Sequence, residues 1–341
     1  MSTAGGARPD AGADGDRAAW IASALIVVVG LAAVGVVGLQ RGDDAAAAPG
    51  STPSTTRPAP PEGPWQRRDS LRTNRDDFGT VVLDDRIWIT GGMTGDRGNK
   101  LSTTEIYDPS TDSWEMGVPM LTGRSSLAAV QVDGTIYAIG GSTLENPYLD
   151  IVEAYDPEAG VWTQLAPMTT ARYEHAAVLL DEMIYVIGGQ TTSGATAEVE
   201  IFDPSTGSWS AGPPMATGRG SMRAVVWDGK IWAGGGNTLD GPSDAWEVFD
   251  PAIGQWSAGP SMPAPMYNFG LAVYADELHA IYHEDHFVLG AGEDAWRTEE
   301  APPISRHGMG MIQLGDLMYA IGGCTEEPLI DVNTVQVWSG A

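Results

Sequence analysis

The chain of 341 residues carries 45 acidic and 18 basic residues, which gives a formal net charge of −27 at pH 7. Proteins that bind DNA or RNA depend on neutralising phosphates, so this excess of negative charge excludes nucleic acid as a partner. The single cysteine, Cys324, excludes an intrachain disulfide and a metal centre built from several cysteines.

The first long apolar segment runs from Ala18 to Leu39 and holds 22 residues without a charge. About 20 residues of helix cross a bilayer core, whereas the apolar part of a cleavable signal peptide is shorter. We therefore expect a short tail over 1–17 and a transmembrane signal-anchor helix over 18–39, with cleavage near Ala45–Ala48 as the alternative. Arginines on both sides leave the orientation open, but a short tail before a large folded part predicts a single-pass protein of the cell membrane with its bulk outside the cytoplasm.

Residues 40–63 follow, and they are rich in Pro, Ala, Ser and Thr. A segment of this composition buries too little apolar surface to fold, so it predicts a disordered, semi-extended stalk. The stalk would hold the next domain, residues 64–341, away from the membrane.

That domain contains an internal repeat marked by double glycines. They lie at Gly91-Gly92, Gly140-Gly141, Gly188-Gly189, Gly235-Gly236 and Gly322-Gly323. Their successive spacings are 49, 48, 47 and 87 residues, so the last interval contains one further unit, which we place at Leu278–His283. The sequence thus predicts six units.

Aromatic residues support the same period. An aromatic followed by Asp-Pro precedes a tryptophan by seven residues in four pairs: Tyr107 and Trp114, Tyr155 and Trp162, Phe202 and Trp209, Phe249 and Trp256. Short alternating strands and Asp-Gly turns indicate four antiparallel strands per unit. The last unit ends without its outermost strand, so we expect the segment near Trp65 to supply it and to close a radial ring of sheets.

These motifs resemble the kelch-repeat family over Pro64–Ala341, and five of the six repeats carry the double glycine. The resemblance implies an all-β fold, a six-bladed kelch β-propeller preceded by one N-terminal transmembrane helix and a Pro/Ala/Ser/Thr-rich stalk. The motif predicts the fold and says little about activity, because propellers carry many unrelated functions.

Arginine recurs at one register, 16 residues before the double glycines: Arg75, Arg124, Arg172, Arg219 and Arg306, with Met266 in the fifth repeat. From Pro64 onward the chain has 14 basic residues, so five at one register are not scattered by chance. The position begins the innermost strand of each blade, and we expect the arginines to line the mouth of the central channel. Kelch proteins that capture acidic peptides use arginines at this place, so the resemblance implies an acidic protein segment or a small carboxylate as the partner.

Guanidinium groups around one mouth repel one another, so their charge needs compensation. Internal acids are one source, with Asp76, Asp77 and Glu174 as candidates, and the arginines would then be structural. A bound anion is the other source, because arginine binds carboxylates through two parallel hydrogen bonds. The two interpretations are compatible with each other.

The fifth repeat loses its glycines and shortens the connection after the second strand to a turn around Glu284-Asp285. We expect a low notch in the rim there, flanked by His283 and His286 with Tyr267 and Asn268 nearby, that either admits a ligand or marks a decayed repeat. His283 and His286 are weak candidates for a metal site with one of the turn acids. No cofactor is expected otherwise.

The sequence therefore favours a binding or scaffolding module over an enzyme. The copper oxidases of kelch type need a tyrosine crosslinked to a cysteine, and no ligand set accompanies Cys324. An isomerase or lyase acting on a sugar acid, similar to exported kelch enzymes that isomerise sialic acid, is the alternative, with Glu174 or His175 as general base. Nearly uniform repeats leave few residues for such a site.

Overall fold

The computed structural model of the protein describes residues 63–95, 98–325 and 330–340. The chain divides into two units, 1–57 and 58–341, and all of the described residues belong to the second. The predicted tail, anchor helix and stalk up to residue 62 lie outside the described residues. Within the described ranges, no helix is both long and apolar enough to cross a bilayer.

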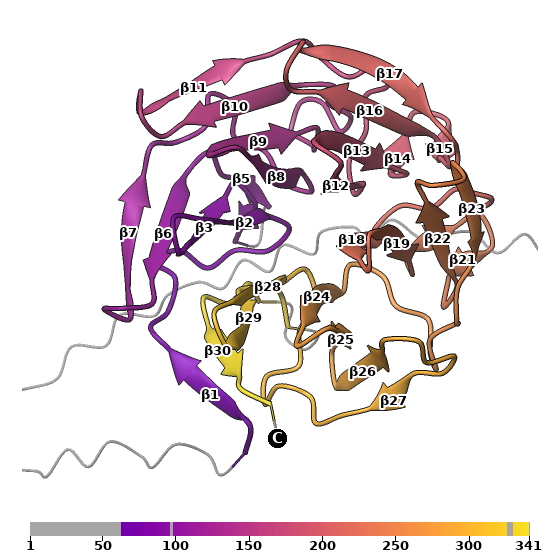
Figure 1. The fold of residues 1–341 in the computed structure, drawn as a ribbon. Helices are drawn as coiled ribbons and strands as arrows, with labels where there is room; N and C mark the ends of the chain where they lie inside the picture. Colours follow the sequence, from indigo (N-terminus) through magenta and orange to yellow (C-terminus); the bar gives the residue numbers. More distant parts are fainter. Residues whose placement is uncertain (1–62, 96–97, 326–329, 341) are drawn as a thin grey trace, which may run out of the picture. The chain divides into compact units, whose positions relative to one another are not determined.

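Six antiparallel sheets of four strands form the blades of a propeller, which confirms the all-β six-bladed prediction (Figure 1). Each of the first five blades places its strands in chain order from the centre outward. Blade 1 contains β2 (Gly79–Leu83), β3 (Arg86–Thr90), β6 (Thr104–Asp108) and β7 (Ser113–Gly117). Blade 2 contains β8 (Ala128–Val132), β9 (Thr135–Ile139), β10 (Val152–Asp156) and β11 (Val161–Gln164).

Blades 3 to 5 repeat this arrangement. Blade 3 contains β12 (Ala176–Leu180), β13 (Met183–Ile187), β16 (Val199–Asp203) and β17 (Ser208–Gly212). Blade 4 contains β18 (Arg223–Trp227), β19 (Lys230–Gly234), β22 (Trp246–Asp250) and β23 (Gln255–Ala258). Blade 5 contains β24 (Gly270–Tyr274), β25 (Glu277–Tyr282), β26 (Asp285–Gly290) and β27 (Arg297–Thr298).

Blade 6 joins the two ends of the domain. It contains β28 (Gly310–Leu314), β29 (Leu317–Ile321) and β30 (Val335–Trp338), and β1 (Trp65–Arg68) forms its outermost strand. β1 pairs antiparallel with β30, and Trp65 lies opposite Trp338. This is the closure expected from the sequence, and it pairs the outer edge of β30 inside the domain.

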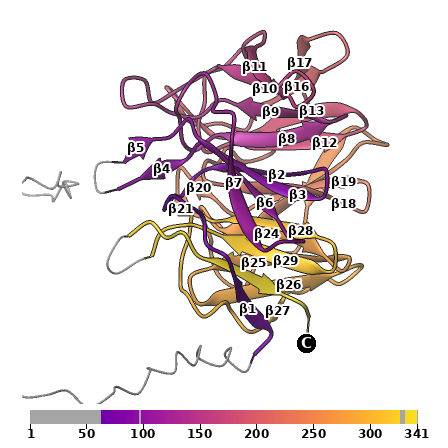
Figure 2. The same cartoon turned by 90° about the vertical axis from the view of Figure 1, so that its left-hand side faces the viewer.

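The connections between the second and third strands define what we call the upper face. Three of them form small hairpins: β4 (Met93–Thr94) with β5 (Asn99–Lys100), β14 (Gln190–Thr191) with β15 (Gly194–Ala195), and β20 (Asn237–Thr238) with β21 (Gly241–Pro242). Figure 2 shows β4, β5, β20 and β21 on the same side of the ring. The fifth blade connects β25 to β26 through residues 283 and 284 alone, as the sequence predicts. The turns between first and second strands form the lower face.

The repeated motifs pack the blades against one another. In blade 1, Tyr107 lies opposite Trp114 with ring centroids 5.1 Å apart, and the indole of Trp114 donates a hydrogen bond to the carbonyl oxygen of Asp69, 3.0 Å away. Gly141 has a φ of +102°, and a Cβ there would lie 2.6 Å from the carbonyl oxygen of Ser125, which lies just before β8. The glycine is therefore required both by its backbone conformation and by close contact.

Candidate functional site

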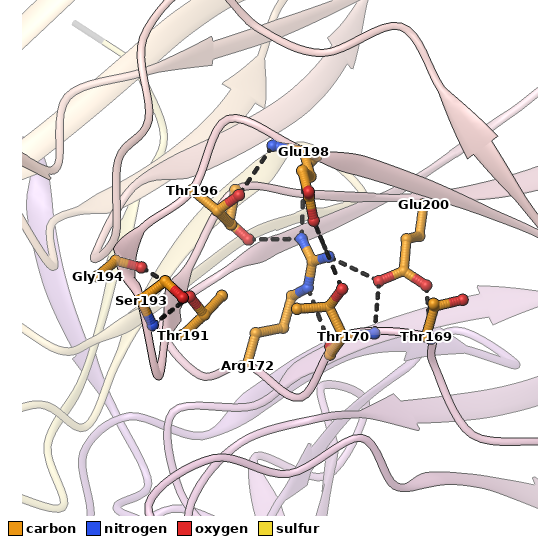
Figure 3. A network of polar contacts seen from close by, with 10 residues as sticks. Thr169, Thr170, Arg172, Thr191, Ser193, Gly194, Thr196, Glu198 and Glu200 are labelled. Atoms are coloured by element: carbon orange, nitrogen blue, oxygen red, sulfur yellow. Dashed lines mark hydrogen bonds and ion pairs between the residues drawn. The ribbon is translucent and has the colours of Figure 1, made fainter.

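The five arginines of the repeated register are buried inside their blades. The exposed fraction of each residue is 0–1%, for Arg75, Arg124, Arg172, Arg219 and Arg306. Four of them form ion pairs with a glutamate of their own blade, at distances of 2.5–2.9 Å. Figure 3 shows Arg172 held among Thr170, Glu198 and Glu200. The expectation of an open ring of arginines at the channel mouth is thus wrong, because these guanidinium groups turn into the sheets instead of toward the axis.

The glutamates that pair with the arginines are Glu105, Glu153, Glu200 and Glu247. Each also accepts hydrogen bonds from the backbone of the loop that leads to its arginine; Glu200, for example, accepts from the N–H groups of Thr169 and Thr170 at 2.7 and 3.0 Å. Asp76, Asp77 and Glu174 make none of these ion pairs. The compensating acids were identifiable in the sequence, because each stands two residues before the aromatic of the aromatic-Asp-Pro motif.

The last two blades depart from this pairing. In blade 5, Met266 and Phe287 take the places of arginine and glutamate and belong to one buried apolar cluster. In blade 6, Gln336 stands where the other blades have glutamate, and Arg306 binds Ala320 and Thr334 through its guanidinium group. Burial lowers the pKa of Arg306 to about 9, and Arg67 acts in the same direction.

A closed ring of backbone hydrogen bonds surrounds the axis two residues after the arginine register. Its six residues share a left-handed backbone conformation with φ between 52° and 63°: Asp77, Ser126, Glu174, Ser221, Asn268 and Gly308. The N–H of each donates to the carbonyl oxygen of the corresponding residue in the preceding blade, at 2.7–3.0 Å, and the N–H of Asp77 donates to Gly308. We call these six residues the axial ring.

Side chains of the axial ring form a polar mouth. Asn268 donates from Nδ2 to Asp77 at 2.6 Å, and Ser221 donates to Glu174 at 2.6 Å. Asn268 also accepts a hydrogen bond of 2.8 Å from Nη2 of Arg223. The pair of Asp77 and Asn268 spans blade 6, whose own residue in the ring is Gly308. A Cβ at Gly308 would lie 3.0 Å from Oδ1 of Asp77, so the glycine leaves room for this contact.

Below the axial ring lies a cavity of 520 Å³ on the propeller axis. It is lined by the innermost strands, β2, β8, β12, β18, β24 and β28, and by four residues of the axial ring. Arg223 is the one arginine among the residues that line this cavity. Burial lowers the pKa of Arg223, while Asp77 and Glu174 act in the opposite direction.

Carboxyl groups outnumber cations at the mouth. Asp76, Asp77, Glu174 and Asp331 interact with one another or with Lys100. Burial raises the pKa of Asp76 to about 9, with further contributions from Asp77 and Asp331. Burial likewise raises the pKa of Glu174. Lys100 donates to Oγ of Ser125 at 2.6 Å, and burial lowers its pKa.

Apolar and aromatic side chains rise around this mouth on the upper face. Leu144, Leu239 and Ile330 lie in the connections between second and third strands and are 66%, 89% and 50% exposed. Tyr267 is 37% exposed and packs on Tyr282 with ring centroids 5.3 Å apart. Exposed apolar side chains that gather on one face mark surfaces that bind other proteins.

Comparison with known proteins identifies the family. Residues 78–282 match the model of the KLHDC2/KLHL20/DRC7 Kelch-repeats domain. The chain belongs to this kelch-repeat family. Kelch-like protein 40 of Xenopus laevis is 39% identical over 89 residues, which are 26% of this chain and 14% of that protein. Kelch-like protein 23 of Homo sapiens is 39% identical over 67 residues, 20% of this chain and 12% of that protein.

This chain therefore matches a small part of those relatives' length. The solved structure of YjhT has a TM-score of 0.68 and 15% identity, and the match covers 80% of this chain and 99% of that chain. A likeness at this identity shows the fold. A kelch propeller is a protein-binding or scaffolding type of module, and this coarse role is what family and fold together support.

Of the predicted binding residues of this kelch propeller, two reach the mouth. Asn268 lies in the axial ring and Tyr267 on the rim beside the short fifth-blade connection. His283 packs on Tyr282 and on His307, with ring centroids 4.2 and 5.1 Å apart. The short connection of the fifth blade is thus flanked by aromatic rings.

The predicted metal pair of His283 and His286 is wrong in its geometry. His286 is fully buried, and its Nε2 lies 2.9 Å from Nδ1 of His279. His279 and His286 lie on the same face of the sheet, because His286 in β26 pairs with Ile281, which is two residues after His279 in β25. His286 also contacts the ring of Trp65, at 6.1 Å between centroids, so it belongs to the packing of blades 5 and 6.

Proposed function

We propose that this kelch propeller is a membrane-tethered module outside the cytoplasm that captures a protein segment on its upper face. The apolar stretch of residues 18–39 supports the tether. The observation that carries the binding proposal is the upper face itself, where exposed Leu144, Leu239, Tyr267 and Ile330 surround a polar mouth. Exposed apolar and aromatic side chains give a protein interface surface that is removed from water, and polar groups fix the register of the partner.

The charge of the mouth indicates the chemistry of the partner. The arginines that favoured an anionic ligand are buried, and four of the five are paired with a glutamate, so they no longer support such a ligand. The ionisable groups that remain at the mouth are Asp77 and Asp331 with Lys100 and Arg223, while burial raises the pKa of Asp76 and of Glu174. The net charge of −27 on the whole chain favours a segment that brings a lysine or arginine flanked by apolar residues.

The test is a selection of random peptides displayed on phage against the purified full-length chain. We expect the enriched peptides to carry a basic residue between apolar ones, and to bind more weakly as salt rises. Affinity is then measured by fluorescence anisotropy for Leu239→Asp and for Ile253→Asp, a matched control in the same blade. Ile253 is 66% exposed and lies in the turn between β22 and β23, on the lower side.

Leu239→Asp should weaken binding about tenfold or more, which corresponds to about 1.4 kcal/mol. Ile253→Asp should leave affinity unchanged. Enrichment of acidic peptides, or equal losses in both variants, would contradict the proposal.

A second candidate is the isomerase or lyase that acts on a sugar acid. The juxtaposition of Glu174 and Arg223 on a 520 Å³ cavity favours it, because a guanidinium binds a carboxylate while a carboxyl group of raised pKa acts as a general acid or base. His175 is a poor base here, since it is 4% exposed and burial lowers its pKa to about 3. Mutarotation of sialic acid by the full-length chain that is lost in Glu174→Gln would establish this activity, and no rate above buffer would exclude it.

A further inference from the structure

Three side chains that could bind a metal ion meet on the upper face where the ring of blades closes. Asp76 precedes the first inner strand, Cys324 follows Gly322-Gly323, and Asp331 ends the connection between the second and third strands of blade 6. One donor atom from each lies within 4.8 Å of the other two. The cluster brings together residues of blades 1 and 6.

The backbone fixes the positions of these residues. The N–H of Asp76 donates to the carbonyl oxygen of Met93 at 3.2 Å, and the carbonyl oxygen of Asp76 accepts from the N–H of Met93 at 3.0 Å. Cys324 makes the corresponding pair of bonds with His307, at 3.0 and 2.8 Å, and is bridged to Asp331 on its other side. The three donors are therefore held in place before any ion binds, as a preorganised site requires.

An unpaired carboxyl oxygen points to a missing ligand. Asp76 is 3% exposed, and none of the described residues donates a hydrogen bond to its Oδ1. A buried acceptor without a partner destabilises the fold. Cys324 is 7% exposed, and its Sγ donates to the carbonyl oxygen of Thr325 over a long 3.4 Å. An ion bonded to Oδ1 would satisfy the orphan acceptor.

We propose that Asp76, Cys324 and Asp331 form a binding site for a divalent transition metal ion of the zinc type, which joins blade 1 to blade 6. A thiolate ligand selects zinc or cobalt over magnesium and calcium, which take oxygen ligands. Zinc bonds of about 2.3 Å to sulfur and about 2.1 Å to oxygen place tetrahedral donors about 3.5 Å apart, so donors within 4.8 Å close on an ion through small side-chain movements.

A further carboxyl group lies near the three donors, since Asp77 interacts with both Asp76 and Cys324. Metal ligands must lose their protons, so binding releases protons and weakens as the pH falls. Lys100 is the nearby cation that opposes binding, although its ammonium is occupied by Oγ of Ser125.

The test uses the full-length chain, reduced and freed of metal with a chelator, and titrated with Co²⁺ or Zn²⁺ alone. We expect a sulfur-to-cobalt charge-transfer absorption in the near ultraviolet, displacement of Co²⁺ by Zn²⁺, and a higher midpoint of thermal unfolding with either ion. Cys324→Ser should remove the charge-transfer band. Asp76→Asn and Asp331→Asn should each weaken Zn²⁺ binding, measured by calorimetry, by tenfold or more.

Asp84→Asn is the matched control, because Asp84 is an exposed aspartate in the turn between β2 and β3 on the lower face, and it should bind as the wild type does. Near-ultraviolet circular dichroism establishes that each variant is folded. A Co²⁺ spectrum without the charge-transfer band, a band that persists in Cys324→Ser, or equal Zn²⁺ affinity in Asp76→Asn, Asp331→Asn and wild type would overturn the proposal.

Discussion

Replacing Gln336 by glutamate should stabilise the propeller, because blade 6 buries an arginine without the carboxylate that four other blades provide. Arg306 is fully buried, and its guanidinium binds Ala320 and Thr334. Gln336 occupies the glutamate position, and its Oε1 accepts no hydrogen bond from the described residues. Gln336→Glu changes one amide to a carboxylate of the same size, so it adds charge without changing volume.

The size of the effect follows from two opposing terms. A charge-assisted hydrogen bond to the arginine contributes about 1.5–3 kcal/mol, whereas burying a new carboxylate is costly. In the blades with a glutamate, backbone N–H groups of the preceding loop reduce that cost, two at Glu105, Glu200 and Glu247 and one at Glu153. The corresponding loop of blade 6 has Pro303 three residues before Arg306, which removes one donor. We expect a net gain of about 1 kcal/mol at pH 7.

The assay is equilibrium unfolding in urea followed by the fluorescence of the 12 tryptophans, on the full-length chain. Paired with Arg306, the new glutamate should have a lowered pKa when folded. The gain is then present above the unfolded glutamate pKa of about 4.3 and disappears as the pH falls through the folded value. Glu200→Gln is the mirror variant, and should lose about 3–5 kcal/mol because it leaves the buried Arg172 with only Glu198, 3.9 Å away, as an acidic partner. The reasoning would be refuted if Gln336→Glu had a lower free energy of unfolding than wild type while Glu200→Gln left that free energy unchanged.

Three further changes test other parts of the fold by the same unfolding assay. Gly308→Ala should lower the free energy of unfolding by about 1–2 kcal/mol, because alanine disfavours a φ of +63° and its Cβ would lie 3.0 Å from Oδ1 of Asp77. An unchanged urea midpoint would show that the axial ring tolerates this strain. Trp65→Ala should lower the free energy of unfolding by about 3–5 kcal/mol, because the buried indole, 1% exposed, attaches β1 to blade 6. A loss under 1 kcal/mol would mean that β1 contributes little to stability. His175→Gln should flatten the acid side of the stability profile by about 1.4 kcal/mol per pH unit. The folded pKa of His175 is about 3, so below pH 6.5 the unfolded chain binds the additional proton; an unaltered slope would contradict this.

The fold could be predicted because its determinants are local and repeat. Gly140 and Gly141, Tyr155 and Trp162 are each required by the strand or turn in which they lie, so their spacing gave the number of repeats, and alternating strands and Asp-Gly turns within each period gave four strands per blade. These signals depend on short sequence distances. The closure by Trp65 spans the whole domain, and it followed from a missing strand at the other end.

The site was harder to predict because side-chain direction depends on partners distant in sequence. The register of Arg124 was found correctly, but its direction is set by Glu153, 29 residues later, which draws it into the blade. The axial ring has no common residue type, since it contains Asp77, Glu174 and Gly308 alike. Only a shared backbone conformation unites it, and composition does not reveal that conformation.

The hydrogen bonds of the axial ring run in one rotational sense, from each N–H to the blade before it, and return to their starting point. Such a circuit has neither beginning nor terminus, so every peptide dipole in it polarises a successor. Each repeat brings one donor and one acceptor to this circuit, and moving the chain ends to another peripheral hairpin would preserve all six links. The axis therefore leaves the place where the polypeptide starts free to change.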